Sequence, residues 1–247
     1  MRWVATLAAA GLGCLFGSVH GQDAEVGVAP VPDPLPQRLL VCQGLPQVFV
    51  RASVARDARA ACDGAARSLA FLARAGLTAP PRTDIDIVPV MPGELAGRAV
   101  GCYLRETKRI ALLSFEAFES GGGWFRVPPS LELYRAAAAH EVAHSVVGCH
   151  SEPRRLAVAA HEYVAYVVFF ATMDPSLRAE VLRKFAGRGF QNPGQISDLS
   201  HFVEPNQFGV DAWRHYLRVA NRAQWLRRVI AGEVVPDLVE DADASTR

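Results

Sequence analysis

The sequence HEVAH at residues 140–144 places two imidazoles and a carboxylate at a spacing that suits a metal ion. Residues four apart lie on the same face of a helix, so His140 and His144 can bind one ion together. Glu141 would lie beside the ion and accept a proton from a water molecule held there, as in metal-assisted hydrolysis. The pattern predicts a Zn²⁺ site with Glu141 as catalytic base, and a third ligand must come from elsewhere in the chain.

Glu162 is the first candidate for the third ligand. It is the only formally charged residue in the apolar stretch 156–173. Burying a lone carboxylate is costly unless something compensates it. A metal ion would do so, as would a pairing arginine or protonation of the carboxylate. The neighbouring His161 diverges from Glu162 by about 100° on a helix, so we expect it to make a hydrogen bond in the core or behind the ligands.

His150 is the competing candidate. Counted from His140 it stands at the eleventh position, where the metzincin pattern H-E-x-x-H-x-x-G-x-x-H has its third histidine. The glycine of that pattern permits the turn that brings the third histidine back to the metal. Here the glycine is Gly148, one place later than the pattern requires, which favours Glu162 over His150.

The elements around the motif follow from turn and capping residues. Pro128 and Pro129 block a helix, Ser130 is a good N-cap, and Gly148 is placed to end the helix that begins there. The small side chains at 136–139 would let another element approach this helix closely. The motif is therefore expected in a helix between Ser130 and Gly148.

These features resemble the gluzincin metallopeptidases over roughly residues 85–232. That family has H-E-x-x-H on one helix and a glutamate ligand on the next, with a small residue three positions after the glutamate, as Ala165 is here. The gap of 17 residues between His144 and Glu162 is close to the short spacings in the family. Most members have glycine directly after the glutamate. This chain has Tyr163 there, which alters the expected shape of the pocket.

The resemblance implies a zinc-dependent peptidase. His140, His144 and Glu162 would bind Zn²⁺, and a zinc-bound water activated by Glu141 would hydrolyse a peptide bond. The expected partner is a peptide or protein substrate. Two alternatives stay open: a metzincin-like peptidase with His150 as third ligand, and a non-catalytic binding or assembly module that retains a zincin-like fold.

The expected fold class is α+β and zincin-like: a small mixed sheet, the motif helix, and a mostly helical C-terminal part. Residue patterns predict a helix at 53–75 and strands at 38–41, 47–50, 85–90, 100–104 and 109–113. The last two strands would form a hairpin containing Cys102. Its edge beside the motif helix is the natural place for an extended substrate to pair.

The C-terminal third is expected to be irregular at 188–205 and then to form one or two helices at 208–231. His201, His215 or Tyr216 could reach the metal site and stabilise an oxyanion, although each also has reasons to serve packing. The expected core contacts of these helices are Trp213, Tyr216, Leu217, Trp225 and Leu226.

The domain prediction begins with a secretory signal at 1–21 and a Pro-rich leader at 22–37. One domain then spans 38–236, and 237–247 is an acidic tail expected to be disordered. The mature chain would be periplasmic or secreted, without a transmembrane segment. An alternative is a lipoprotein acylated at Cys14.

Charge and cysteines complete the prediction. With 26 basic and 25 acidic residues and no basic stripe, the chain lacks the footprint of a nucleic-acid-binding protein. Four cysteines would remain after removal of the signal, which in an exported protein suggests two disulfides. The expected pairs are Cys42–Cys62 and Cys102–Cys149.

Overall fold

A mixed β-sheet forms one end of the molecule in the computed structural model, which describes residues 13–16, 36–97, 99–151 and 156–235. The strand order in the described part is β1-β5-β6-β4-β3-β2. The strands are β1 (Gly13–Phe16), β2 (Arg38–Val41), β3 (Val48–Ala52), β4 (Thr83–Val88), β5 (Ala99–Leu104) and β6 (Arg109–Leu113). Strands β3, β4 and β6 run parallel to their neighbours within that group, and the other pairs are antiparallel.

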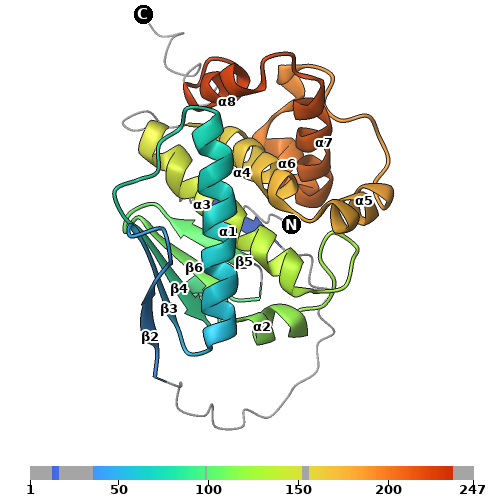
Figure 1. Ribbon diagram of the computed structural model, residues 1–247. Helices are drawn as coiled ribbons and strands as arrows, with labels where there is room; N and C mark the ends of the chain where they lie inside the picture. The colour runs from blue at the N-terminus through green and yellow to red at the C-terminus, as the bar shows by residue number, and fades with distance from the viewer. Residues whose placement is uncertain (1–12, 17–35, 98, 152–155, 236–247) are drawn as a thin grey trace, which may run out of the picture.

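Helices form the rest of the chain. They are α1 (Ala55–Arg74), α2 (Phe115–Ser120), α3 (Leu131–Ser151), α4 (Val158–Thr172), α5 (Pro175–Arg183), α6 (Asp198–Val203), α7 (Pro205–Arg218) and α8 (Arg222–Ile230). Figure 1 shows α1 and α3 beside the sheet and α4 to α8 gathered at the opposite end of the molecule. The α+β class, the mixed sheet and the mostly helical C-terminal part are as predicted.

Helices α3 and α4 are buried almost all round. That is the pattern of helices inside a core rather than on its surface. Helix α1 packs on α3 where Gly64 meets the small side chains predicted to allow close approach. A Cβ at Gly64 would lie only 2.8 Å from the Cβ of Ala138.

The motif helix begins as predicted and ends later than predicted. The Ser130 hydroxyl accepts a hydrogen bond from the backbone amide of Leu133 (3.2 Å), which caps α3. Gly148 does not end the helix, because α3 continues to Ser151. The glycine instead makes room for a neighbour on β5: a Cβ at Gly148 would lie 3.1 Å from the ring of Tyr103.

The strand predictions agree with the structure to within a few residues, and 208–231 forms two helices, α7 and α8. The prediction of an irregular 188–205 is wrong in part, because α6 lies there behind an N-terminal capping box formed by Ser197 and Ser200. Leu217, predicted to lie in the core, is exposed, whereas Trp213 and Leu226 are buried.

One predicted disulfide is confirmed and the other is wrong. Cys42 and Cys62 are bonded, which joins the turn after β2 to α1. Cys149 is a free, exposed cysteine, while Cys102 is disulfide-bonded but not to Cys149. Side chains alternate along a strand, and on β5 Gly101 and Tyr103 face α3. Cys102 therefore faces away from α3, in a small cluster with Met91 and Ala111.

The predicted leader at 22–37 and tail at 237–247 lie almost wholly outside the described residues, as does most of the predicted signal at 1–21. Within that signal, the backbone of Gly13–Phe16 forms β1 and pairs antiparallel with β5. In the described part of the chain, no helix has the length and apolar character needed to cross a bilayer.

Candidate metal centre

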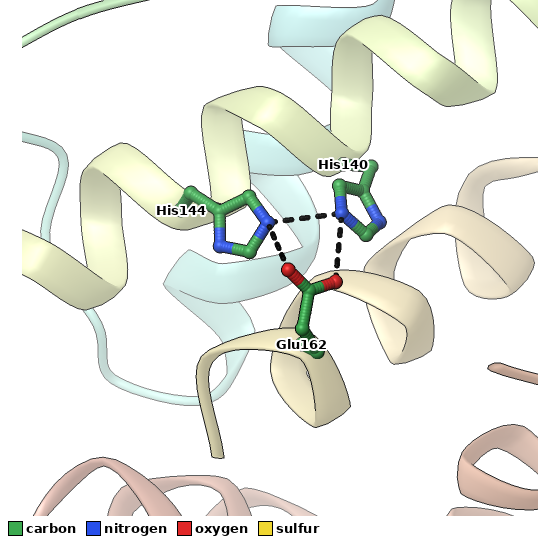
Figure 2. Close-up of side chains that lie close together, drawn as sticks. All are labelled: His140, His144 and Glu162. Carbon is green, nitrogen blue, oxygen red and sulfur yellow. Dashed lines mark hydrogen bonds and ion pairs between the residues drawn. The ribbon is translucent and has the colours of Figure 1, made fainter. Parts of the chain in front are cut away.

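Three side chains predicted to bind metal converge between α3 and α4 (Figure 2). The Nε2 atoms of His140 and His144 lie 2.9 Å apart. The carboxylate of Glu162 faces both rings, with Oε2 3.4 Å from Nε2 of His140 and Oε1 3.5 Å from Nε2 of His144. Each residue offers one ligand atom, and the three atoms lie within 4.8 Å of one another.

The two helices place these groups for simple reasons. The histidines are four residues apart and so share the face of α3 that meets α4. Glu162 lies in the first half of α4, whose N-terminus is fixed by the Asp198 carboxylate through a 2.7 Å hydrogen bond from the backbone amide of Ala159. Helix α6, which begins at Asp198, is thereby held against the start of α4.

Burial controls the charge of the three groups. His140, His144 and Glu162 are all 0% exposed. Burial lowers the pKa of both histidines well below its usual value, with a further contribution from His201 on each. Neutral imidazoles have the free lone pair that a cation requires. Burial also raises the pKa of Glu162 well above its usual value, and the negative charge of Asp198 adds to this effect.

Glu162 has no arginine or lysine beside it among the described side chains. Its charged neighbours within 4 Å are the imidazoles of His140, His144 and His201. Pairing with an arginine, which the sequence left open, is therefore not how this carboxylate is compensated. A cation bound between the three side chains would compensate it.

Glu141 lies beside the three residues and faces β5 rather than the other carboxylate's ring partners. A Cβ at Gly101 would lie 2.7 Å from its Oε1, so the absent side chain of Gly101 makes the space that the carboxylate occupies. Burial raises the pKa of Glu141 well above its usual value, the charge of Glu162 adds to this, and the backbone of Tyr103 opposes it.

Two further polar groups reach the centre from other elements. His201 on α6 places its Nε2 3.6 Å from Oε2 of Glu162. Burial lowers the pKa of His201 to about 4, so its ring is neutral near pH 7. Tyr166 lies one helical turn after Glu162, and its ring packs 4.7 Å from that of His140, centroid to centroid. The sequence named His201 but not Tyr166, although the spacing of four from Glu162 would have indicated it.

His150 lies away from the centre. Its ring is exposed and its Nε2 accepts a hydrogen bond of 3.0 Å from the backbone amide of Thr78. Six residues of continuous helix separate it from His144, a rise of about 9 Å. The metzincin-like arrangement needs a turn at Gly148 that this structure does not contain.

The other candidates also have structural partners. His161 forms a 2.6 Å hydrogen bond with the guanidinium of Arg105, as expected for a residue behind the ligands. The hydroxyl of Tyr163 bonds to Nδ1 of His215 at 2.7 Å, so both point away from the three converging side chains. Tyr216 packs on Phe71 and Trp213 instead.

The residues fit a divalent metal ion on two grounds. Two imidazole nitrogens and one carboxylate are a donor set that suits Zn²⁺ and related ions. In addition, buried polar atoms without a hydrogen-bond partner in the described part of the chain gather here: the carboxylate oxygens of Glu141 and Glu162, the hydroxyl of Tyr166, Nδ1 of His140 and His144, and both ring nitrogens of His201. Buried polar groups are rarely left without partners, so this concentration points to a bound group.

Comparison with known proteins places the chain in a family without assigning it a function. A family model described as "Family of unknown function (DUF6639)" matches residues 48–239, which is more than half of the chain. The chain belongs to this family. The matched range includes the motif, Glu162 and His201. No curated protein and no solved structure matches the chain, so the functional argument for this DUF6639 member depends on the chemistry of the site.

Proposed function

We propose that this chain is a zinc-dependent peptidase with a gluzincin-like site, in which His140, His144 and Glu162 hold the metal and Glu141 is the general base. The single observation that supports this most is the convergence of the three ligand atoms with a fourth carboxylate beside them that is not part of the group. A site that only stabilised the fold would need no such carboxylate.

The protein's own groups have distinct tasks in this proposal. When bound, Zn²⁺ acts as a Lewis acid on a carbonyl and lowers the pKa of water toward about 7. Glu141, next to Gly101, takes the proton and delivers it to the leaving amine. His201 and Tyr166 lie on the α4 side of the centre, where a ring N–H and a hydroxyl can donate hydrogen bonds to a developing oxyanion.

Strand β5 is the proposed place for the substrate backbone. One side of β5 pairs with β6, and the other side is extended by the four residues of β1. The antiparallel pairing of Gly13–Phe16 with β5 has the form of a bound extended peptide. Because Gly101 of the same strand touches Glu141, a peptide held there would lie beside the general base.

The proposed cellular location is the periplasm or the exterior of the cell. The Cys42–Cys62 disulfide supports an oxidising compartment, since such bonds are rare in reducing ones. The signal-like sequence of the first 21 residues points the same way.

A second candidate function follows from the burial of the centre. His140, Glu141, His144 and Glu162 are all 0% exposed, which suits a metal that stabilises a non-catalytic binding module. In that case Glu141 would have no chemical task, and its replacement would leave the protein's activity and metal content unchanged.

The substitution Glu141→Gln tests the proposal. The change keeps the size of the side chain but removes the base, and general-base catalysis contributes typically about 10²–10⁴-fold in rate. We expect cleavage of a mixed peptide library to fall by at least that factor while bound zinc stays near the wild-type level. The matched control is Glu180→Gln on α5, remote from the centre, which should cleave normally. Equal activity of Glu141→Gln and wild type would refute the proposed role.

A further inference from the structure

An apolar cavity of about 260 Å³ opens beside the N-terminal end of β5. Its wall includes Met91, Ala99, Val100, Ala117, Phe118 and Trp124, and the glycines at 121–123 complete it. None of the described residues that line it carries a charge. Pockets for drug-sized ligands measure roughly 300–1,000 Å³, so this smaller cavity suits one side chain rather than a whole ligand.

The cavity adjoins the candidate metal centre along two routes. On β5, the lining residue Val100 directly precedes Gly101, the residue against which Glu141 lies. On the other wall, the ring of Trp124 lies 5.1 Å from that of Phe169, centroid to centroid. Phe169 in turn packs against His140 at 6.4 Å. A group seated in the cavity is thus within one residue of the base and two rings of a ligand.

The glycines keep the cavity empty. Gly97 and Gly122 have φ values of +69° and +85°, and a Cβ built on either would meet nothing within 4 Å. Positive φ excludes most other residues at such positions, so this backbone fixes an opening that side chains do not fill. The opening is therefore a property of the local chain conformation rather than of loose packing.

An extended peptide on β5 would reach this opening. The pairing of β1 with β5 runs from Gly13 opposite Tyr103 to Phe16 opposite Ala99. Ala99 is itself part of the cavity wall. A peptide paired in the same way has its backbone at the rim of the cavity, where one of its side chains can enter.

We propose that this cavity is the specificity subsite of the enzyme and binds one large apolar side chain of a peptide, such as Phe, Leu or Met. The inference rests on the proposed function for its biological meaning, but the preference is a property of binding. It predicts that the chain selects peptides by a bulky apolar residue near the scissile bond and disfavours an acidic residue there.

Binding to an inactive form tests the subsite without requiring turnover. The probes are pentapeptides of alanine, blocked at both ends, with Phe, Leu or Asp placed in turn at each position. They are titrated calorimetrically into the full zinc-loaded chain bearing Glu141→Gln. Because a single methylene in an apolar pocket discriminates about 10–200-fold, we expect Phe or Leu at one position to strengthen binding at least about 10-fold over alanine.

The variant Ala117→Phe fills the cavity from α2. It should reduce that preference to less than about 3-fold while leaving zinc content and the affinity for the all-alanine peptide near the level of the parent. The matched control is Ala179→Phe, the same change at an exposed position of α5. If Ala117→Phe fails to fold, Ala117→Leu applies the same obstruction with a smaller side chain.

The outcomes separate the subsite from the reaction. A preference that survives Ala117→Phe, a preference for Asp, or no preference at all would overturn the subsite. A preference that the cavity variant removes, in a protein whose intact Glu141 form cleaves none of these peptides, would uphold the subsite and count against the proposed peptidase.

Discussion

Gly101 is the residue on which the position of Glu141 depends. A Cβ there would lie 2.7 Å from Oε1 and 2.9 Å from Cδ of Glu141, which is closer than van der Waals contact allows. The end of the glutamate side chain can move away, so an added methyl group displaces the carboxylate instead of disrupting the sheet. The same strand would hold the substrate, so the base and the substrate share one support.

The substitution Gly101→Ala should therefore reduce activity without removing the metal. Moving a catalytic group by about 1 Å can cost on the order of 10²-fold in rate, so we expect kcat to fall by roughly that factor. Bound zinc and the thermal midpoint should change little. The measurement is kcat together with zinc content, and Gly194→Ala in an exposed loop is the control. Loss of zinc along with activity would mean that Gly101 supports the fold of the centre and not the position of Glu141.

At this scale the sequence indicated most of the centre. The spacing of His140 and His144, and the isolation of Glu162 in an apolar stretch, were enough to name the three residues that converge. His201 and Tyr166 could not be ranked in the same way. Each becomes informative only through its distance to the cluster, and those distances depend on how α6 and α7 pack against α4.

Helix α3 is positioned by close packing against α1, and Gly64 is the point of closest approach. A side chain there would meet the backbone of Arg135 and the Cβ of Ala138, directly behind the motif residues. Neither group can move without shifting a helix. The run of small residues at 136–139 predicted this contact, although the sequence did not show which element would make it.

The substitution Gly64→Val should lower the free energy of unfolding by about 1–3 kcal/mol, the usual cost of overpacking a core. Ala66→Val, on the exposed face of the same helix, is the control for the lower helix propensity of valine. Denaturant titration of both variants measures the difference. Equal stability of the two would show that α1 and α3 tolerate a wider separation than the structure indicates.

Element prediction failed where tertiary contacts override local signals. Gly148 has the residue type of a helix end, but the ring of Tyr103 fills the space beside it and α3 continues to Ser151. Helix α6 was missed because its six residues are too few to show a hydrophobic period, even though Ser197 is a good cap. The orientation of Cys102 depended on the face of β5 on which it lies, which the sequence pattern indicated only weakly.

For the whole molecule, the Cys42–Cys62 disulfide joins the sheet side to α1, and α1 in turn supports α3. The bond closes a segment with a sequence separation of 20. A loop of that size stabilises the folded state by about 3 kcal/mol. The fold that presents the metal ligands is thus partly maintained by a bond that forms in oxidising compartments.

Replacing both Cys42 and Cys62 by serine should lower the free energy of unfolding by about 2–4 kcal/mol under oxidising conditions. Cys149→Ser should have no measurable effect, because Cys149 is exposed and unbonded. Urea titrations with and without reductant measure both. If Cys149→Ser proved as damaging as the double variant, the pairing in this structure would be wrong.

The central claim concerns the third ligand and is tested most directly by the zinc content of the purified, folded chain, measured by elemental analysis for the wild type, Glu162→Ala and His150→Ala. We predict about one zinc per chain in the wild type and in His150→Ala. Glu162→Ala should bind zinc at least about 100-fold more weakly, since loss of even a supporting group behind the ligands costs 10–100-fold. Zinc retained in Glu162→Ala and lost in His150→Ala, or no zinc in any folded form, would contradict the account.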